Sequence, residues 1–246
     1  MECRFLAVAN QKGGVGKTAT AVNVAAALAV LELETLLIDL DPQANATGNL
    51  LNDAGIPGIA EVLIENMDLQ RVVRSTGRKH LSIAPGNKRL SSYVPETRME
   101  LREKIRSGSS RYSFVVLDCP PALGGATVSA LASCDEIVVP VQAEYLALEG
   151  LSSLITAVNR VRDGLAPVKT RYLLTMFDGR NRLANEVEAD LRRHFGDSVS
   201  RAVIPRSVRM AEAPGFRRTI FEHAANSGVA DAYAAFAQEV ALDVGR

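Results

Sequence analysis

The sequence predicts an α/β fold in which a mostly parallel, twisted sheet is flanked by helices on both faces. Short runs that are apolar at every position recur along the chain, and stretches of helical composition separate them. Continuously apolar strands are typical of a parallel sheet that is covered on both sides. A glycine-rich turn follows the first run, and a turn between a strand and a helix is where such folds bind phosphate.

The strands and helices alternate in the order that such a sheet requires. Strands are predicted at residues 4–9, 35–40, 114–118, 136–141 and 171–177. Helices are predicted at residues 18–31, 145–162, 182–195 and 230–244. No repeat, low-complexity tract or linker interrupts this order, so we expect residues 1–246 to form a single domain.

The composition excludes several classes of protein. Hydrophobic residues make up 47% and charged residues 23% of the chain, as in ordinary globular proteins. No stretch approaches the roughly 20 apolar residues of a membrane span, and no signal peptide is recognisable. We therefore expect a cytoplasmic protein. The three cysteines form no C-x-x-C pair, which argues against a metal–cysteine site.

Basic residues are concentrated in one part of the chain although the formal net charge is zero. Residues 160–218 contain 13 Lys or Arg against 7 Asp or Glu. Most of these are arginines, whose planar guanidinium binds phosphate oxygens through several donors. On charge alone, however, a solvated surface with ion pairs is favoured over contact with a nucleic-acid backbone.

The segment KGGVGKT at residues 12–18 has the features of a phosphate-binding loop, or P-loop. Gly13, Gly14 and Gly16 allow a tight turn that directs backbone N–H groups at a phosphate. The helix that follows begins near Lys17, and its positive end favours an anion. Lys17 is expected to reach the β- and γ-phosphates, and the Thr18 hydroxyl to bind Mg²⁺.

A P-loop site also needs carboxylates at the ends of neighbouring strands. Asp118 closes the run FVVLD, and Asp39 and Asp41 close the run TLLIDLD. Asp118 is expected to hold the water shell of the metal, and Asp41 to orient or deprotonate the attacking water. The usual pattern G-x-x-x-x-G-K-[ST] places a glycine where this chain has Gln11. With that one departure, the residues predict a P-loop ATPase.

Six blocks of sequence extend this reading over nearly the whole chain. They are KGGVGKT with Lys12, DLDPQANAT (39–47), LDCPP (117–121), PVQAEYLALEGL (140–151), LTMFDGR (174–180) and IPRSVRMAEAP (204–214). In content and order they resemble the ParA/Soj chromosome- and plasmid-partitioning ATPases, a branch of the deviant Walker A group that also contains MinD. Gln11 is itself the pattern of this group, and QAN at 43–45 is a mild change from the more common QGN.

The resemblance implies an ATP-dependent switch that uses ATP and Mg²⁺. Such a protein forms a homodimer with ATP, binds DNA without sequence preference, and is released when a ParB-type partner stimulates its slow hydrolysis. It would be cytoplasmic, nucleoid-associated and independent of membranes, and it would drive chromosome or plasmid segregation. Lys12 resembles the signature lysine, which reaches across the dimer to the partner's phosphates.

The resemblance also assigns roles to particular residues. Catalytic roles fall to Lys12, Lys17 and Asp41, and the metal-associated residues would be Thr18, Asp41 and Asp118. The nucleotide would contact Lys12, Gly13, Gly14, Val15, Gly16, Lys17, Thr18 and Ala19, with Met176, Phe177, Pro205 and Arg206 at the adenine. Arg209 matches a DNA-binding position of similar proteins, and local charge adds Arg180, Arg182, Arg217 and Arg218 as further candidates.

Four other functions were weighed against this one. An ATPase that positions a protein cargo or organelle would use the same switch, and the sequence does not separate the two. A MinD-like membrane ATPase needs a basic amphipathic C-terminal helix, whereas residues 231–246 are acidic and alanine-rich. An iron–sulfur carrier needs a bridging cysteine pair. A metabolic P-loop enzyme needs its own substrate pocket, and only the arginines offer polar groups for one.

Overall fold

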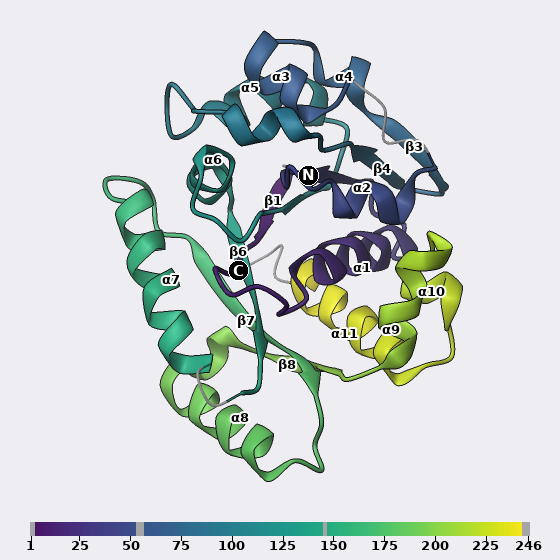
Figure 1. Ribbon diagram of the computed structural model, residues 1–246, viewed down its shortest axis with the longest axis vertical. Helices are drawn as coiled ribbons and strands as arrows, with labels where there is room; N and C mark the ends of the chain where they lie inside the picture. Colours follow the sequence, from purple (N-terminus) through teal and green to yellow (C-terminus); the bar gives the residue numbers. More distant parts are fainter. Residues whose placement is uncertain (1–2, 53–56, 145–146, 243–246) are drawn as a thin grey trace.

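The computed structural model describes residues 3–52, 57–144 and 147–242. They form one eight-stranded sheet with helices around it (Figure 1). The strand order is β3-β4-β2-β5-β1-β6-β7-β8. All neighbouring pairs are parallel except β3 and β4. The strands are β1 (Arg4–Val8), β2 (Thr35–Asp39), β3 (Arg74–Arg78), β4 (Leu81–Ala84), β5 (Phe114–Asp118), β6 (Glu136–Gln142), β7 (Lys169–Phe177) and β8 (Val199–Pro205). The predicted fold class is confirmed.

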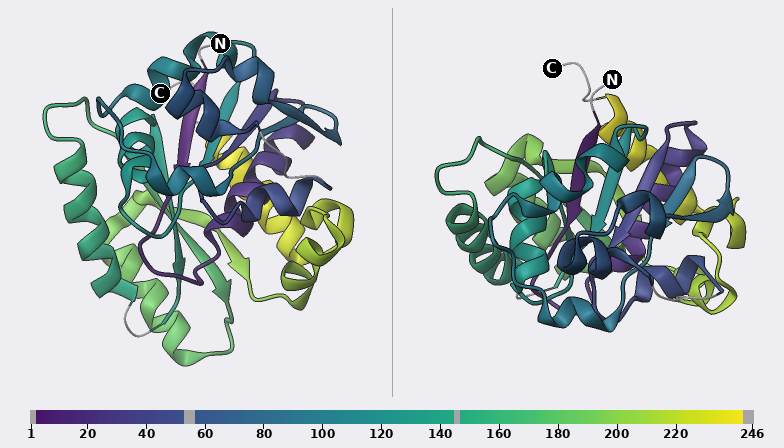
Figure 2. Two further views of the ribbon diagram at one scale, coloured as in Figure 1. Left: turned by 45° about the horizontal axis from the view of Figure 1, so that its top comes forward. Right: turned by 90° about the horizontal axis from the view of Figure 1, so that it is seen from above.

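Helices cover both faces of this sheet (Figures 1 and 2). They are α1 (Lys17–Val30), α2 (Asn45–Leu50), α3 (Ile59–Glu65), α4 (Leu69–Val72), α5 (Glu100–Ser109), α6 (Gly125–Ser133), α7 (Ala147–Val161), α8 (Arg182–Phe195), α9 (Val208–Glu212), α10 (Ile220–His223) and α11 (Gly228–Leu242). Short 3₁₀ turns are η1 (Lys88–Ser92), η2 (Gly196–Ser198) and η3 (Ala213–Phe216). All eight strands belong to one sheet, and the single domain over residues 1–246 stays a prediction.

Two apolar cores form because successive side chains of a strand point to opposite faces. In β1, Phe5 and Ala7 pack in the core beneath α3 to α8, whereas Leu6 and Val8 pack beneath α1 and α11. A strand that contributes to both cores must be apolar throughout, which explains the continuous runs in the sequence. In the C-terminal helix, Tyr233 and Phe236 are fully buried against α1 and the sheet, as its apolar positions predicted.

Most predicted elements occur close to their predicted bounds. β5 and α8 match the predicted residues, and α1 is shifted by one residue. The predicted helices 145–162 and 230–244 are present as α7 and α11, but residues 145–146 and 243–244 lie outside the described residues. In the described ranges, every helix is too short or too polar to cross a membrane.

Three strands and several short helices were not predicted. β3 reads RSTGR and has no apolar pattern, because it is an edge strand with a neighbour only on one side. β4 is four residues long, which is too short for a periodicity to be recognised. β8 alternates buried and less buried positions near the other edge of the sheet, so it lacks the continuous apolar run of the central strands.

The strand order places the candidate site. β5 lies between β1 and β2, so the carboxyl ends of these three strands meet at one edge of the sheet. In the strand register, Asp118 is level with Val8 of β1 on one side and with Asp39 of β2 on the other. Ligands bind at the carboxyl ends of the strands in open α/β sheets, and the glycine-rich loop leaves β1 at this edge.

Candidate active site

The glycine-rich loop forms the turn that the sequence predicts. Gly14 and Gly16 have φ angles of +78° and +86°, which residues with a Cβ rarely adopt. Gly16 is the N-cap of α1, and its carbonyl accepts a hydrogen bond from Thr20 N at 2.8 Å. A Cβ at Gly14 would meet no atom within 4 Å. The backbone conformation therefore requires glycine here, and the space above the loop stays open to a ligand.

Lys17 lies inside the loop with 8% of the residue exposed. Its Nζ donates to the carbonyl of Lys12 at 2.9 Å, so the ammonium closes the turn onto itself. Burial lowers the pKa of Lys17, and the carboxylates of Asp118 and Asp41 oppose that shift. An ammonium held by one neutral carbonyl and two nearby acids is well placed to exchange that carbonyl for a phosphate oxygen.

Asp118 is a fully buried carboxylate at the end of β5. Neither of its oxygens has a hydrogen-bond partner among the described residues. Burial raises the pKa of Asp118 well above its usual range and the charge of Asp39 adds to this, while the Thr18 hydroxyl, nearby but outside hydrogen-bonding geometry, opposes it. A buried carboxylate with no partner is costly, and a cation or its bound water would satisfy it.

These residues fit the requirements of Mg²⁺. The ion keeps several waters and takes only one or two carboxylates together with substrate phosphates. Thr18 and Asp118 would hold it here, with Asp41 beside them. Among the residues that the structure describes, no group of three or more His, Cys, Asp or Glu side chains is placed to hold a metal ion by itself.

Asp39 serves a different purpose from the other two acids. Its Oδ2 accepts from the Thr47 amide at 2.8 Å and from the Thr47 hydroxyl at 2.7 Å, and its Oδ1 accepts from the Asp41 amide at 3.2 Å. Burial raises the pKa of Asp39 to about 6, although the bonds from Thr47 oppose the shift. Asp39 therefore anchors the turn that carries Asp41.

The anchor extends to the end of β4 through Thr47. Gly86 N donates to the Thr47 hydroxyl at 2.9 Å. A Cβ at Gly86 would lie 2.7 Å from the Asp39 carbonyl oxygen, so no larger residue fits. Neither Thr47 nor Gly86 has a role predicted from the sequence. Thr47 lies in the block DLDPQANAT, which is one of the six that carry the family resemblance and could have drawn attention to it. Nothing in the sequence near Gly86 pointed to this contact.

Asp41 itself is nearly buried, with 9% of the residue exposed. Its Oδ1 accepts from Gln43 N at 2.9 Å, and its carbonyl accepts from Ala44 N at 2.9 Å. Ala44 has a φ of +54° and is the N-cap of α2. The carboxylate is thus fixed by the turn around Pro42 and lies close enough to Lys17 to influence its pKa.

The four residues predicted at the adenine lie together beside the loop. Phe177 of β7 pairs with Pro205 of β8, and Arg206 N donates to the Phe177 carbonyl at 2.9 Å. Met176 has a φ of +50°, and its Cε would be 3.7 Å from a Cβ at Gly16. These contacts place the ends of β7 and β8 next to the start of α1.

Lys12 lies on the outer side of the same loop. Its Nζ forms an ion pair with Glu144 Oε2 at 2.8 Å, and the two side chains are 37% and 49% exposed. Lys12 N donates to Asn10 Oδ1 at 3.0 Å. The two lysines of the loop are therefore distinct, since Lys17 is buried in the turn and Lys12 pairs at the surface. Glu144 was not singled out in the sequence, although it lies within PVQAEYLALEGL.

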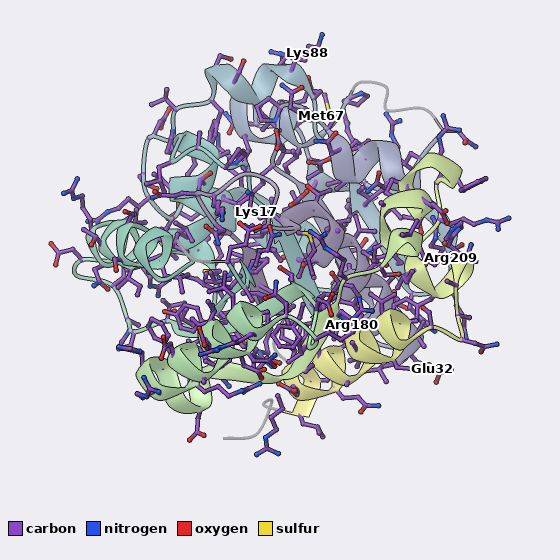
Figure 3. All side chains as sticks on the ribbon, turned by 60° about the horizontal axis from the view of Figure 1, so that its bottom comes forward. Lys17, Glu32, Met67, Lys88, Arg180 and Arg209 are labelled. Carbon is purple, nitrogen blue, oxygen red and sulfur yellow. The ribbon has the colours of Figure 1, made fainter. Side chains whose placement is uncertain are left out.

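The candidate DNA-binding arginines fall into two groups. Arg209 of α9, Arg217 and Arg218 lie within a single segment, whereas Arg180 and Arg182 lie where β7 leads into α8. Arg209 and Arg180 are labelled in Figure 3. Arg180 pairs with Asp178 at 2.9 Å, Arg182 with Glu186 at 2.8 Å, and Arg209 with Glu212 at 3.4 Å. These ion pairs are exposed to solvent, and exposed pairs contribute little to stability, so a polyanion can displace the acids.

The glycine-rich turn before α1 and the acids at the ends of the neighbouring strands define a P-loop nucleoside triphosphatase. Residues 3–170 match the family described as AAA domain. The chromosome-partitioning ATPase Soj of Thermus thermophilus is 46% identical over 243 residues, covering 96% of this chain and 95% of the relative. The sporulation initiation inhibitor protein Soj of Bacillus subtilis is 38% identical over 250 residues, covering 98% and 99% of the two chains.

A solved structure of a differently named protein shares the fold. Cobyrinic acid a,c-diamide synthase of Mycobacterium smegmatis, with bound ADP and magnesium, has a TM-score of 0.85 and 28% identity, and the match covers 99% of this chain and 97% of that chain. The chain belongs to the ParA/Soj family of chromosome-partitioning ATPases. This membership confirms the predicted ATPase activity and the predicted use of ATP and Mg²⁺.

Proposed function

We propose that this protein is a DNA-partitioning switch that dimerises with ATP, binds DNA non-specifically in that state, and leaves DNA after hydrolysis. The observation that carries the proposal is the position of the two loop lysines. Lys17 occupies the buried turn at its own nucleotide site, whereas the Lys12 ammonium pairs with an exposed carboxylate. Lys12 is therefore available to a triphosphate presented by a second copy of the chain.

The residues around the loop divide the work of hydrolysis. Lys17 and the loop amides bind the β- and γ-phosphates, and Mg²⁺, when bound, neutralises the charge that develops on them. Asp41 orients the attacking water and accepts its proton. Asp39 takes no part in the chemistry but keeps Asp41 in place through its bond to the Asp41 amide. The adenine lies against Met176, Phe177, Pro205 and Arg206.

Dimerisation explains how a chain with zero net charge grips DNA. One monomer offers only a modest group of arginines, chiefly Arg209, Arg217 and Arg218. Two protomers on one duplex double the number of phosphate contacts. The logarithm of DNA affinity falls with the logarithm of salt concentration by about 0.9 for each neutralised phosphate. Doubling the number of phosphate contacts therefore makes the dimer bind DNA much more tightly than the monomer at low salt.

The family membership supports chromosome partition as the process served, and we extend the proposal to plasmid segregation. A ParB-type or similar partner supplies the stimulation of a slow intrinsic ATPase, by analogy with switch ATPases whose missing group comes in trans. The protein would then reside on the nucleoid while it holds ATP.

The proposal is tested by co-sedimentation with random-sequence DNA in ATP, in ADP and without nucleotide, at two salt concentrations. We expect binding with ATP that weakens steeply with salt, and weak binding in the other two conditions. Equal binding in all three would refute the switch. Lys12→Ala is the matched variant, because it leaves Lys17 in place. It should bind ATP but form no dimer and lose DNA, and dimers that survive this change would contradict the role of Lys12.

A further inference from the structure

Arg78, the last residue of β3, bonds to three separate parts of the chain. Its Nε donates to Glu222 Oε2 at 2.8 Å, and one terminal nitrogen donates to the Arg217 carbonyl at 2.8 Å. The other donates to the Leu50 carbonyl at 3.4 Å and to the Thr76 carbonyl at 3.1 Å. Its side chain is 18% exposed, so Arg78 is a fixed connector and not a free surface charge.

Two of these bonds hold the segment that carries the candidate DNA-binding arginines. Glu222 also accepts from the Thr219 amide at 2.8 Å and from its hydroxyl at 3.0 Å, forming the capping box of α10. Arg217 has a φ of +52° and ends η3. Arg78 therefore bonds both to the backbone at Arg217 and to Glu222 in the cap of α10, and Arg218 lies between these two points in the chain.

The bond to the Leu50 carbonyl reaches α2, the helix that follows the turn with Asp39 and Asp41, which we call the acid turn. Leu50 is the last residue of α2, and Thr47 in the same helix holds Asp39. α2 also packs directly against η3, and Figures 1 and 2 show α2 beside the α9–α10 region. A displacement of the acid turn therefore moves the Leu50 carbonyl, which Arg78 connects to the Arg217 carbonyl.

A second connection joins the same segment to α1. The buried Asn23 accepts from Ile220 N at 2.8 Å, and its own amide donates to the Ala19 carbonyl at 2.8 Å. Asn23 thus fixes the start of α10 to the helix that begins at the phosphate loop. With α1 as the fixed support and α2 as the element next to the acids, residues 208–223 are held from two sides.

We propose that Arg78 is a positioning residue that couples the nucleotide site to the DNA-binding surface. It transmits the position of α2 to the backbone of Arg217 and to Glu222, and so sets the orientation of the segment with Arg209, Arg217 and Arg218. This inference rests on the proposed function. Coupling between two sites needs an element whose position both of them bias, and α2 is that element here.

The test uses Arg78→Lys, which keeps the charge but loses the planar group that reaches Glu222 and two carbonyls at once. The matched control is Lys79→Arg, because Lys79 is the next residue, is 80% exposed and lies 3.9 Å from Glu32. DNA affinity is measured on the full chain with a non-hydrolysable ATP analogue and with ADP. Dimer formation, basal ATPase rate and thermal unfolding are recorded in parallel.

We expect the ratio of DNA affinities in the two nucleotide states to fall by about fivefold or more in Arg78→Lys, with dimerisation and basal ATPase rate unchanged. Lys79→Arg should keep the ratio of the natural chain. If the natural chain binds DNA more tightly with the ATP analogue than with ADP and Arg78→Lys keeps that difference, the coupling role is wrong while the proposed function stands. If the natural chain binds DNA equally in the two nucleotide states, the proposed function itself fails.

Two further measurements separate coupling from other roles of Arg78. An equal loss of DNA affinity in both nucleotide states would indicate that Arg78 only stabilises the surface, and it would overturn the proposal. Should Arg78→Lys fail to fold, Glu222→Gln replaces it, since the amide oxygen can still cap α10 but the charge facing Arg78 is gone. That variant should lower the ratio of DNA affinities in the two nucleotide states, and a ratio equal to that of the natural chain would overturn the coupling role.

Discussion

Replacing Thr47 by valine tests the anchor beneath the acid turn. Valine has nearly the shape of threonine but removes the hydroxyl that donates to Asp39 at 2.7 Å and accepts from Gly86 N at 2.9 Å. Thr47 is fully buried, so water cannot replace these bonds without rearrangement. The change leaves the Gly86 amide unsatisfied and removes one of the two bonds to Asp39 Oδ2.

The size of the effect follows from these two losses. A hydrogen bond to a charged group is worth about 1.5–3 kcal/mol, and a buried donor left without a partner costs about 1–3 kcal/mol. We therefore expect the free energy of unfolding to fall by roughly 2.5–6 kcal/mol. For a chain of this length each kcal/mol lowers the melting temperature by about 2–4 °C, so the expected decrease is about 5–24 °C.

The same change should slow hydrolysis more than it weakens binding. Of its two bonds from Thr47, Asp39 would keep only the one from the amide, so the turn that carries Asp41, the proposed catalytic residue, would be held less firmly. A displaced catalytic group costs roughly tenfold to a hundredfold in kcat. The dissociation constant for ATP, set by the loop and Lys17, should change little. Urea or thermal unfolding, single-turnover hydrolysis and nucleotide titration measure the three quantities.

Thr47→Ser is the control, because serine keeps the hydroxyl and loses only a methyl group worth about 0.8 kcal/mol. It should restore most of the stability and of kcat. If Thr47→Val unfolds at the same temperature as the natural chain and hydrolyses ATP at the same rate, the contacts of Thr47 neither stabilise the fold nor position Asp41.

The remaining predictions concern four charged residues. Lys17→Ala should abolish nucleotide binding in a titration, and near-normal affinity would contradict its place in the loop. Asp41→Ala should form an ATP dimer that stays on DNA, whereas normal turnover in a phosphate-release assay would remove its catalytic role. Arg209→Glu should weaken DNA binding with little change in nucleotide affinity, and DNA binding equal to that of the natural chain would exclude this contact. Burial raises the pKa of Asp39 from 3.8 to about 6, so the folded state binds an extra proton between these values and stability falls as pH rises through this window. In urea titrations without nucleotide, the natural chain should therefore lose stability from pH 4 to pH 6 relative to Asp39→Asn. Parallel curves for the two proteins would contradict the raised pKa.

Local signals were enough for the elements around the phosphate loop. An apolar run, a glycine-rich turn and an alanine-rich helix follow one another within residues 4–31, and the structure has β1, the turn and α1 there. Each signal reflects a local requirement, namely positive φ angles at Gly14 and Gly16 and burial on both faces of a central strand. Edge strands lack the second requirement, which is why β3 escaped prediction.

The identity of the acids could also be read from the sequence, but their separate roles could not. Asp39, Asp41 and Asp118 all follow apolar runs, and the resemblance distinguished Asp41 and Asp118. Only the folded chain separates Asp39, which accepts three hydrogen bonds, from Asp118, which has no partner among the described residues. The difference arises because α2 returns beneath β2 and places Thr47 against one acid only.

The sequence by itself determined the class of the protein, because the loop, the strand-end acids and the order of six blocks are local patterns that chemistry ties to ATP. The tertiary structure decided which distant residues meet. Asp39 and Asp118 are adjacent because β5 pairs with β2, and Arg78 reaches Arg217 because the β3–β4 hairpin lies beside the α9–α10 segment. Such contacts depend on strand order and on packing between elements far apart in the chain, and no local pattern encodes them.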